Sequence, residues 1–299
     1  VHIQSYHTFV PPLAMLAALR QRIPYVVTFH AGGNSSVLRN SVRRTQRAAL
    51  KPLLRQANQL IALANFEIEQ YGKELGLSPE HFVLIPNGCD LPEIPPLVKD
   101  RHDHPLIASV GRLERYKGHQ RILTALPYIL EQKPDARLWI AGTGPYEPEL
   151  RRLARKLGVQ DQVEIRAVPS GDRQRMAAEL SRASLAVMLS EYETHPLAVL
   201  EALSLGVPAL VADNSGLREL ADAGLASRIR TDSSPQEIAR AVIDQLDHPM
   251  IPAQLNLPTW DDCAASLFNL YASIIGIPVG EDFANINVEP VLPSHTGRD

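Results

Sequence analysis

The sequence predicts an α/β protein built on two doubly wound parallel sheets. Short apolar runs rich in Val, Ile and Leu recur along the 299 residues, and helical patterns separate many of them. This alternation is typical of parallel strands whose sheet is covered by helices on both faces. The length favours two domains, and a hydrophobic content of 45% can fill a core in each.

The first domain is predicted to comprise residues 1–90 and to contain four strands. That number is below the ~5–6 strands of an average sheet, so one sheet edge is expected to be bare. The strand-like runs are Val1–Ser5, Tyr25–Phe29, Gln59–Leu63 and Phe82–Ile85. A polar segment containing several prolines follows, and we expect residues 91–103 to link the two domains.

The second domain is predicted to comprise residues 104–258. Its strand-like runs are Leu106–Val110, Arg137–Ala141, Val163–Arg166, Leu185–Leu189 and Pro208–Ala212. Helical patterns lie between them at Gly118–Glu131, Tyr146–Leu157 and Arg173–Arg182. Residues 259–275 read as a closing amphipathic helix, and residues 276–299 are expected to form a loose tail.

The charge of the chain is unevenly distributed. No Asp or Glu precedes Glu67, and that segment carries a formal +8 although the whole chain carries −3. Six cations fall between Arg39 and Arg55 in a helical pattern, whose predicted apolar side is Val42, Ala49, Leu50, Leu53 and Leu54. Such a helix can lie on an anionic membrane or face a phosphorylated acceptor. A solvated helix face is the alternative interpretation.

The two cysteines indicate a reduced setting. Cys89 and Cys263 are far apart and form no CxxC pattern, so neither a disulfide framework nor a zinc site is expected. No apolar run reaches the length that spans a membrane. We expect a cytoplasmic protein that can associate peripherally with the inner face of the membrane.

The run from Ser190 to Leu203 carries the strongest functional signal. An apolar strand-like run precedes it, and Thr194 and Pro196 are suited to the cap and first turn of the helix that follows. A helix N-terminus at the carboxyl end of a strand binds phosphates well. Glu193 and Glu201 bracket this point, which suits a sugar–diphosphate–nucleoside. An N-capped core helix with one glutamate paired to an arginine is the alternative interpretation.

Two further loops are candidates for phosphate binding. Gly111 and Arg112 follow the first strand of the second domain, and Lys117 lies just before the next helix. Both cations can therefore reach one dianionic group. Gly142 and Gly144 follow the next strand and allow close backbone approach. The pattern there is not a dinucleotide-binding fingerprint, because Glu147 occupies its third glycine position.

Together these motifs resemble the retaining glycosyltransferases of the GT-B fold, of the family-4 type. The resemblance implies two Rossmann-like domains that face a central cleft, with the first domain incomplete here. Its most specific element is the spacing of Glu193 and Glu201, with seven residues between them. The other similar segments are Val26–His30, Ile85–Asp90, Gly111–Gly118, Asn214–Glu219 and the helix that begins near Trp260.

The resemblance implies a role for each candidate residue. Arg112 and Lys117 would neutralise the diphosphate of a UDP- or GDP-linked donor. Glu201 would hold the ribose, and Glu193 would hold the donor sugar and act as a catalytic residue. His30 would be the second catalytic residue, with His7 a weaker candidate. The remaining donor-binding residues would be Gly111, Gly142, Gly144, Thr194, His195, Pro196 and Leu197.

The expected reaction is transfer of a sugar from the nucleotide-sugar to a lipid-linked or saccharide acceptor, with retention of configuration. No Asp-x-Asp sequence occurs, so we expect no essential metal. We also expect no cofactor and no nucleic-acid partner. A glycoside hydrolase would need two carboxylates ~5–10 Å apart and would act without a nucleotide. A nucleotide-sugar epimerase would change the donor without an acceptor.

Two departures from the family pattern leave another alternative open. The first strand and its glycine-rich loop are not found in this chain, and Thr194, His195 and Pro196 stand where glycine and an aromatic residue are common. The chain is therefore either a fragment of an enzyme or a shortened, non-catalytic relative that binds nucleotide-sugars. Donor binding without turnover would indicate the latter.

Overall fold

The computed structural model describes residues 1–6, 8–30, 37–89, 91–92, 104–169, 171–252 and 254–278, and for residues 37–44 the backbone alone. His7, most of the expected linker and most of the expected tail lie outside these residues. The chain divides into two compact units, which we describe separately. One consists of Val1–Gly88 and Pro258–Asp299, and the other of Cys89–Leu257.

The first unit contains a parallel sheet of four strands in sequential order, so all four predicted strands are confirmed. They are β1 (His2–Gln4), β2 (Val26–Thr28), β3 (Gln59–Ala62) and β4 (Phe82–Leu84). Its helices are α1 (Val10–Gln21), α2 (Val37–Leu54), α3 (Asn65–Leu75), the 3-10 turn η1 (Pro79–His81) and α10 (Trp260–Ile275).

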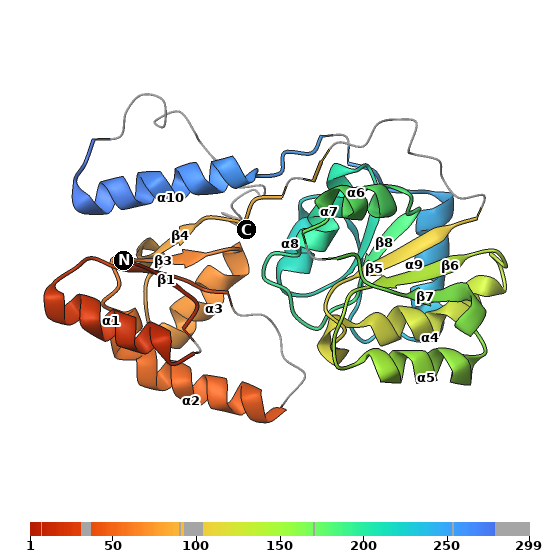
Figure 1. Cartoon of the computed structure of the whole chain (residues 1–299), viewed down its shortest axis with the longest axis horizontal. Helices are drawn as coiled ribbons and strands as arrows, with labels where there is room; N and C mark the ends of the chain where they lie inside the picture. The colour runs from red at the N-terminus through yellow and green to blue at the C-terminus, as the bar shows by residue number, and fades with distance from the viewer. Residues whose placement is uncertain are drawn as a thin grey trace, which may run out of the picture. The chain divides into compact units, whose positions relative to one another are not determined.

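The two faces of this sheet are covered by different helices (Figure 1). Val27 and Leu60 point into a core that includes Met15 of α1, Leu54 of α2 and Tyr71 of α3. The intervening residues face the other way, since side chains alternate along a strand. On that second face, Val26, Ile61 and Ile85 pack against α10 through Cys263, Leu267, Leu270, Tyr271 and Ile274.

The residues that α2 buries differ in part from those predicted. Leu50 and Leu54 are buried as expected, whereas Ala49 is exposed. The side chain of Val42 lies outside the described residues. Ala49 is exposed because α2 packs on the sheet and α3 through a narrower stripe than its apolar pattern suggests.

The second unit contains a parallel sheet of six strands in the order β10-β9-β8-β5-β6-β7. The strands are β5 (Leu106–Val110), β6 (Arg137–Ala141), β7 (Val163–Ile165), β8 (Leu185–Met188), β9 (Ala209–Ala212) and β10 (Ser227–Ile229). The order of strands reverses between β5 and β8. In a doubly wound fold the crevice for ligands lies at such a switch point, beyond the carboxyl ends of the strands.

Among the described residues, six α-helices and two 3-10 turns accompany this sheet, and Figure 1 shows their arrangement. They are η3 (Arg115–Lys117), α4 (His119–Leu130), α5 (Glu147–Leu157), η4 (Gln160–Gln162), α6 (Arg173–Ser181), α7 (Leu197–Ser204), α8 (Ser215–Asp222) and α9 (Pro235–Asp247). The helices predicted by residue range are α4, α5 and α6, with boundaries within two residues of those expected. The helix expected after Thr194 is α7. The edge strand β10 was not predicted, because its sequence Ser-Arg-Ile lacks an apolar run.

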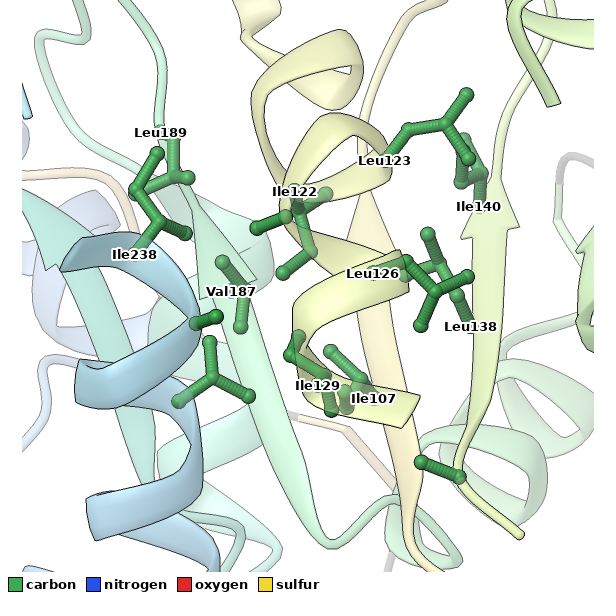
Figure 2. Packing of buried hydrophobic residues seen from close by; sticks show 14 of the residues in the cluster. Ile107, Ile122, Leu123, Leu126, Ile129, Leu138, Ile140, Val187, Leu189 and Ile238 are labelled. Carbon is green, nitrogen blue, oxygen red and sulfur yellow. The ribbon is translucent and has the colours of Figure 1, made fainter. Parts of the chain in front are cut away.

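The core of the second unit fixes the strands that carry the candidate site. Figure 2 shows Ile122, Leu126 and Ile129 of α4 packed over β5 and β6, beside Ile238 of α9. The three α4 side chains have no solvent exposure. Burying one such side chain stabilises the fold by about 1.5–3 kcal/mol. The ends of β5 and β8 are thus held by a packed interior.

Among the described residues, no helix combines the length and apolar character that crossing a membrane requires.

Candidate functional site

Three loops meet at the switch point of the second sheet. The loop after β5 (Gly111–Gly118) and the loop after β8 (Leu189–Pro196) are joined by backbone contacts. The Glu191 N–H donates to the Tyr116 carbonyl oxygen over 2.7 Å. The loop before α8 joins them, because the Asn214 side-chain amide donates to the Ser190 carbonyl oxygen over 2.9 Å. These contacts form one rigid cluster from segments distant in sequence.

Gly118 is required where the first two loops touch. Its φ angle is +77°, in the left-handed region. A Cβ atom at this position would collide with the carbonyl oxygen of Leu189. Only glycine therefore permits this approach of the two loops.

Lys117 and Glu193 form the central ion pair of the site. The Lys117 Nζ lies 2.6 Å from Glu193 Oε1, and the two side chains are only 14% and 11% exposed. The backbone of Glu193 is also held, because its N–H donates to the Ser215 hydroxyl over 3.0 Å. Its carbonyl oxygen accepts from the Gly216 N–H over 2.9 Å. The structure thus brings together two predicted site residues that are 76 positions apart.

Arg112 lies close to this pair but is more open to solvent. Its side chain is 63% exposed, and its guanidinium forms an ion pair with Glu114 at 2.9 Å. It also donates to the Tyr116 hydroxyl over 2.6 Å. The Arg112 Cζ and Lys117 Nζ lie 5.9 and 5.4 Å from the centroid of the same Tyr116 ring. Both predicted cations therefore gather around Tyr116, each with its own carboxylate partner.

The glycines after β5 and β6 allow these two loops to approach each other. A Cβ atom on Gly142 would collide with the Gly111 carbonyl oxygen, and one on Gly144 with the Leu113 carbonyl oxygen. The backbone also pairs, because the Leu113 N–H donates to the Thr143 carbonyl oxygen over 2.9 Å. The close approach predicted for Gly142 and Gly144 is thus an approach to the neighbouring loop.

His119, the first residue of α4, holds the Gly111–Gly118 loop through hydrogen bonds. Burial, together with the nearby Lys117 charge, lowers the pKa of His119 to about 4, so the ring is neutral at pH 7. Its Nε2–H donates to the Arg112 carbonyl oxygen over 3.2 Å. Its Nδ1 then accepts from the Ser109 hydroxyl over 2.8 Å. Neither His119 nor Ser109 was predicted as a site residue from the sequence, although a histidine in the first turn of the following helix was an available signal.

The start of α7 differs from the prediction. The helix begins at Leu197 and its N-cap is Pro196, with no side-chain hydrogen bond at the cap. Thr194 lies two residues too early to cap the helix, so that prediction is wrong. The Leu197 N–H donates to the His195 carbonyl oxygen over 2.9 Å, so it is not a free donor as expected. The helix N-terminus still faces the same end of the sheet.

His195 contributes a buried ring nitrogen beside α7. Burial lowers the pKa of His195 to about 4, so the imidazole is neutral at pH 7. Its Nδ1 atom is buried and has no hydrogen-bond partner among the described residues. A buried polar atom without a partner is costly, which suits a site that a ligand completes.

Glu201 lies in the second turn of α7, as predicted. Its side chain is 17% exposed, and its carboxylate lies 3.7 Å from Arg173 at the start of α6. Burial raises the pKa of Glu201, and the charge of Arg173 opposes that rise. Both bracketing glutamates thus have a cationic neighbour. The alternative interpretation of the sequence, in which one of the two glutamates pairs with an arginine, is therefore confirmed for Glu201.

His30 belongs to the first unit. It follows β2 directly and is exposed, and its Nε2 lies 2.5 Å from the Gln4 side-chain oxygen. Burial of part of the ring lowers the pKa of His30. The contacts within the second unit gather Arg112, Lys117 and Glu193, whereas His30 is placed at the carboxyl end of the other sheet.

Among the described residues, no three His, Cys, Asp or Glu side chains are grouped in a way that could hold a metal ion.

Comparison with protein families identifies the chain. The model described as "Glycosyl transferases group 1" matches residues 93–256, which is more than half of the chain. The chain belongs to this family. A second model, described as "Glycosyltransferase Family 4", matches residues 1–93. Together the two matches cover residues 1–256.

Curated relatives of this group 1 glycosyltransferase are longer than the chain. A glycogen synthase from Mycobacterium tuberculosis is 29% identical over 83% of this chain and 60% of the relative. A GDP-mannose-dependent alpha-(1-6)-phosphatidylinositol dimannoside mannosyltransferase from the same species is 30% identical over 70% of the chain and 56% of the relative. The chain spans about 60% of the length of the curated relatives it matches.

Solved structures share the fold. Anabaena Alr3699/HepE in complex with UDP and glucose has a TM-score of 0.74 and 18% identity, covering 91% of this chain and 77% of that chain. Sucrose-phosphate synthase from Thermosynechococcus elongatus has a TM-score of 0.70 and 21% identity, covering 92% and 73%. The predicted α/β fold of the GT-B glycosyltransferases is therefore confirmed.

The buried histidine beneath the loop predicts a pH dependence of stability. The lowered pKa of His119 means that the unfolded chain binds more protons than the folded one between about pH 4 and the ordinary histidine value of 6.5. Stability is then retained above pH 6.5 and falls as the pH drops towards 4, by about 3 kcal/mol for this group.

Urea unfolding at a series of pH values would measure this effect. His119→Gln should reduce the loss of stability below pH 6.5, and the part due to His195, whose pKa burial also lowers to about 4, should remain. The variant also lowers stability at neutral pH. His248→Gln is the matched control, because the His248 side chain is 83% exposed. An equal acid sensitivity in all three proteins would contradict the assignment to His119.

Proposed function

We propose that this chain carries the donor site of a retaining glycosyltransferase that uses a UDP- or GDP-linked sugar. The observation that carries the proposal is the Lys117–Glu193 ion pair at 2.6 Å, which joins the loops after β5 and β8 at the switch point of the sheet. A cation and a carboxylate that can accept hydrogen bonds from hydroxyls thus lie side by side. A diphosphate linked to a sugar needs both.

The proposed roles follow from charge and position. Lys117 and Arg112 neutralise the diphosphate, for which Arg112 leaves Glu114 and turns its exposed guanidinium to the ligand. Glu193 accepts hydrogen bonds from sugar hydroxyls once the phosphates share Lys117. Glu201, partly buried in α7, accepts from the ribose hydroxyls. The charge that develops on the departing diphosphate is then stabilised by these two cations, Lys117 and Arg112.

The N-terminus of α7 completes the proposed diphosphate site. Thr194, His195, Pro196 and Leu197 form the turn that precedes it, and the positive end of the helix dipole favours an anion there. Gly111, Gly142 and Gly144 contribute by letting the loops after β5 and β6 approach each other. His30, from the first unit, is proposed to contact the reacting sugar.

The relatives support a nucleotide-sugar donor, and their names indicate two classes of acceptor. One relative is named as a glycogen synthase and another as a GDP-mannose-dependent mannosyltransferase of a phosphatidylinositol dimannoside. A structure with the same fold holds UDP and glucose. By analogy, we propose a saccharide or a lipid-linked acceptor for this chain. No cofactor or essential metal is proposed. The acceptor's proton would pass to the leaving phosphate.

We predict that Arg112→Ala weakens binding of UDP or GDP by about 10–100-fold. The reason is the loss of one charge-assisted contact, worth about 1.5–3 kcal/mol. Titration calorimetry with both nucleotides measures the effect. Arg115→Ala is the matched control, since Arg115 is an exposed arginine of the same loop. Parent-like affinity in Arg112→Ala, with nucleotide binding present in the parent, would rule out the role of Arg112.

We also propose that the first unit contacts an anionic membrane, through the surface around α1 as well as through the Arg39–Arg55 segment. Among the α2 cations with described side chains, Arg47 forms an ion pair with Glu74 at 3.1 Å, and Lys51 donates to the Glu74 carbonyl oxygen. Apolar side chains are exposed on and next to α1, at Phe9 (93%) and Leu13 (65%). With no acid before Glu67, this surface suits anionic lipid.

Vesicle co-sedimentation tests this contact. Binding to vesicles that contain phosphatidylglycerol should weaken at high salt, because ions screen the attraction. The double variant Phe9→Ser/Leu13→Ser should reduce binding several-fold. Ile251→Ser is the control, since Ile251 is an exposed apolar residue of the other unit at 53%. Binding that ignores lipid charge and salt, or that Ile251→Ser reduces equally, would contradict the proposal.

A further inference from the structure

Five polar side chains of the first unit share one face of its sheet. β1 and β2 pair in parallel with Gln4 opposite Thr28 and His2 opposite Val26. Side chains alternate along a strand, so His2, Gln4 and Thr28 point to the same face, and the side chain of His30 follows in the same alternation. This is the face that α10 covers, and Tyr271 of α10 reaches it. The sheet register therefore places His30 in line with residues that no motif connects to it.

Hydrogen bonds link these side chains into a chain from α10 to His30. The Tyr271 hydroxyl lies 2.5 Å from His2 Nδ1, and His2 Nε2 lies 2.6 Å from the Thr28 hydroxyl. The Gln4 amide nitrogen lies 3.1 Å from His2 Nε2 and 3.3 Å from His2 Nδ1. The Gln4 amide oxygen lies 2.5 Å from His30 Nε2. The His2 ring also packs edge-on against Tyr271, with centroids 5.7 Å apart.

The chemistry of the amide determines which nitrogen of His30 carries the proton. A side-chain carbonyl oxygen only accepts hydrogen bonds, so the nitrogen beside it must be Nε2–H. A neutral imidazole has one N–H, so the Nδ1 of His30 is an acceptor. The Gln4 NH2 group faces the His2 ring, and the Gln4 oxygen faces His30.

We propose that Gln4 is a positioning residue for His30. Its side-chain oxygen holds the imidazole as the Nε2–H tautomer, which leaves Nδ1 to accept a hydrogen bond from a sugar hydroxyl. His2, clamped between Tyr271 and Thr28, orients Gln4 in turn, so α10 contributes to the state of His30. The sugar contact rests on the proposed function, whereas the tautomer and its dependence on Gln4 do not.

Nuclear magnetic resonance of the histidine ring nitrogens tests the inner part of this chain, without donor or acceptor. The His30 signals are identified by their loss in His30→Asn. In the parent at pH 8, His30 should be mainly the Nε2–H tautomer. Gln4→Leu should change the tautomer ratio at least twofold. Gln4→Glu should raise the His30 pKa by about one unit, because a carboxylate beside the ring favours its charged form.

Matched controls use a glutamine of the same unit. Gln70 lies on α3 and bonds to Glu74, so Gln70→Leu and Gln70→Glu should leave the His30 tautomer and pKa unchanged. If Gln4→Leu and Gln4→Glu behave like these controls, the proposal is overturned. Because no nucleotide is present, the result is independent of whether the second unit binds a donor.

Tyr271→Phe tests the outer part. It removes one hydroxyl and keeps the ring, so the fold should be maintained, as checked by the urea midpoint. The His2 signals should shift, and the Nε2–H fraction of His30 should fall by less than in Gln4→Leu. Unchanged His2 and His30 signals in a folded Tyr271→Phe protein would overturn the role assigned to α10.

Discussion

Replacing Lys117 with methionine should lower the free energy of unfolding by about 3–5 kcal/mol. The change leaves the Glu193 carboxylate in a residue that is only 8% exposed, without the ammonium 2.6 Å away. An unpaired buried charge is among the most destabilising lesions in a protein. Urea unfolding measures the loss. The same variant should fail to bind UDP or GDP in the calorimetric titration, since the proposed diphosphate contact is removed.

Two further variants test whether the loss of stability comes from burial of the unpaired charge or simply from loss of an ion pair. Lys133 and Asp247 form a pair at 2.5 Å whose side chains are 29% and 42% exposed, so Lys133→Met should cost only about 0–1 kcal/mol. The double variant Lys117→Met/Glu193→Gln should recover much of the lost stability, because no charge remains buried. A Lys133→Met protein as unstable as Lys117→Met would show that burial is not the reason.

Gly118→Ala should be the most damaging glycine substitution that we predict in the second unit. The new methyl group would collide with the Leu189 carbonyl oxygen, and the φ angle of +77° is strained for alanine. We expect a loss of about 3–5 kcal/mol, of which the left-handed backbone accounts for about 1–2 kcal/mol and the collision for the rest. Nucleotide affinity should also fall, because the loops after β5 and β8 are pushed apart.

Gly158→Ala is the control for this prediction. Gly158 has a φ angle of +70°, and a Cβ atom there would meet nothing within 4 Å. It should therefore lose only the backbone contribution of about 1–2 kcal/mol and keep nucleotide binding. Equal destabilisation by both substitutions, measured by urea unfolding, would mean that the contact between the loops is not rigid.

Much of the fold was predictable because its signals are local. The runs that form β1 to β9 are short, apolar and bounded by turn residues, and the alternation with helices indicates parallel sheets. The edge strand β10 escaped, because Ser227 and Arg228 carry no such signal and pair only through their backbone with β9. A strand at the edge of a sheet is held by backbone hydrogen bonds to its neighbouring strand, so it does not require a run of apolar side chains.

The start of α7 shows where local rules mislead. Thr194 has the side chain of a capping residue and stands just before a helical pattern, yet the helix begins after Pro196. The backbone around Thr194 is used otherwise, since Gly216 packs against the carbonyl oxygens of Glu193 and Thr194. A contact with a distant loop thus outweighs a capping preference of about 1 kcal/mol.

The sequence alone determined the α/β class, the order of most strands and helices, and the spacing of Glu193 and Glu201. These depend on periodicity and on separations of a few residues. Only the tertiary structure decided the partners: Lys117 with Glu193, His119 with the Arg112 carbonyl oxygen, and Gln4 with His30. Such pairs arise from strand register and from the approach of loops far apart in the chain. No local pattern encodes these, because each contact depends on where the rest of the chain has packed.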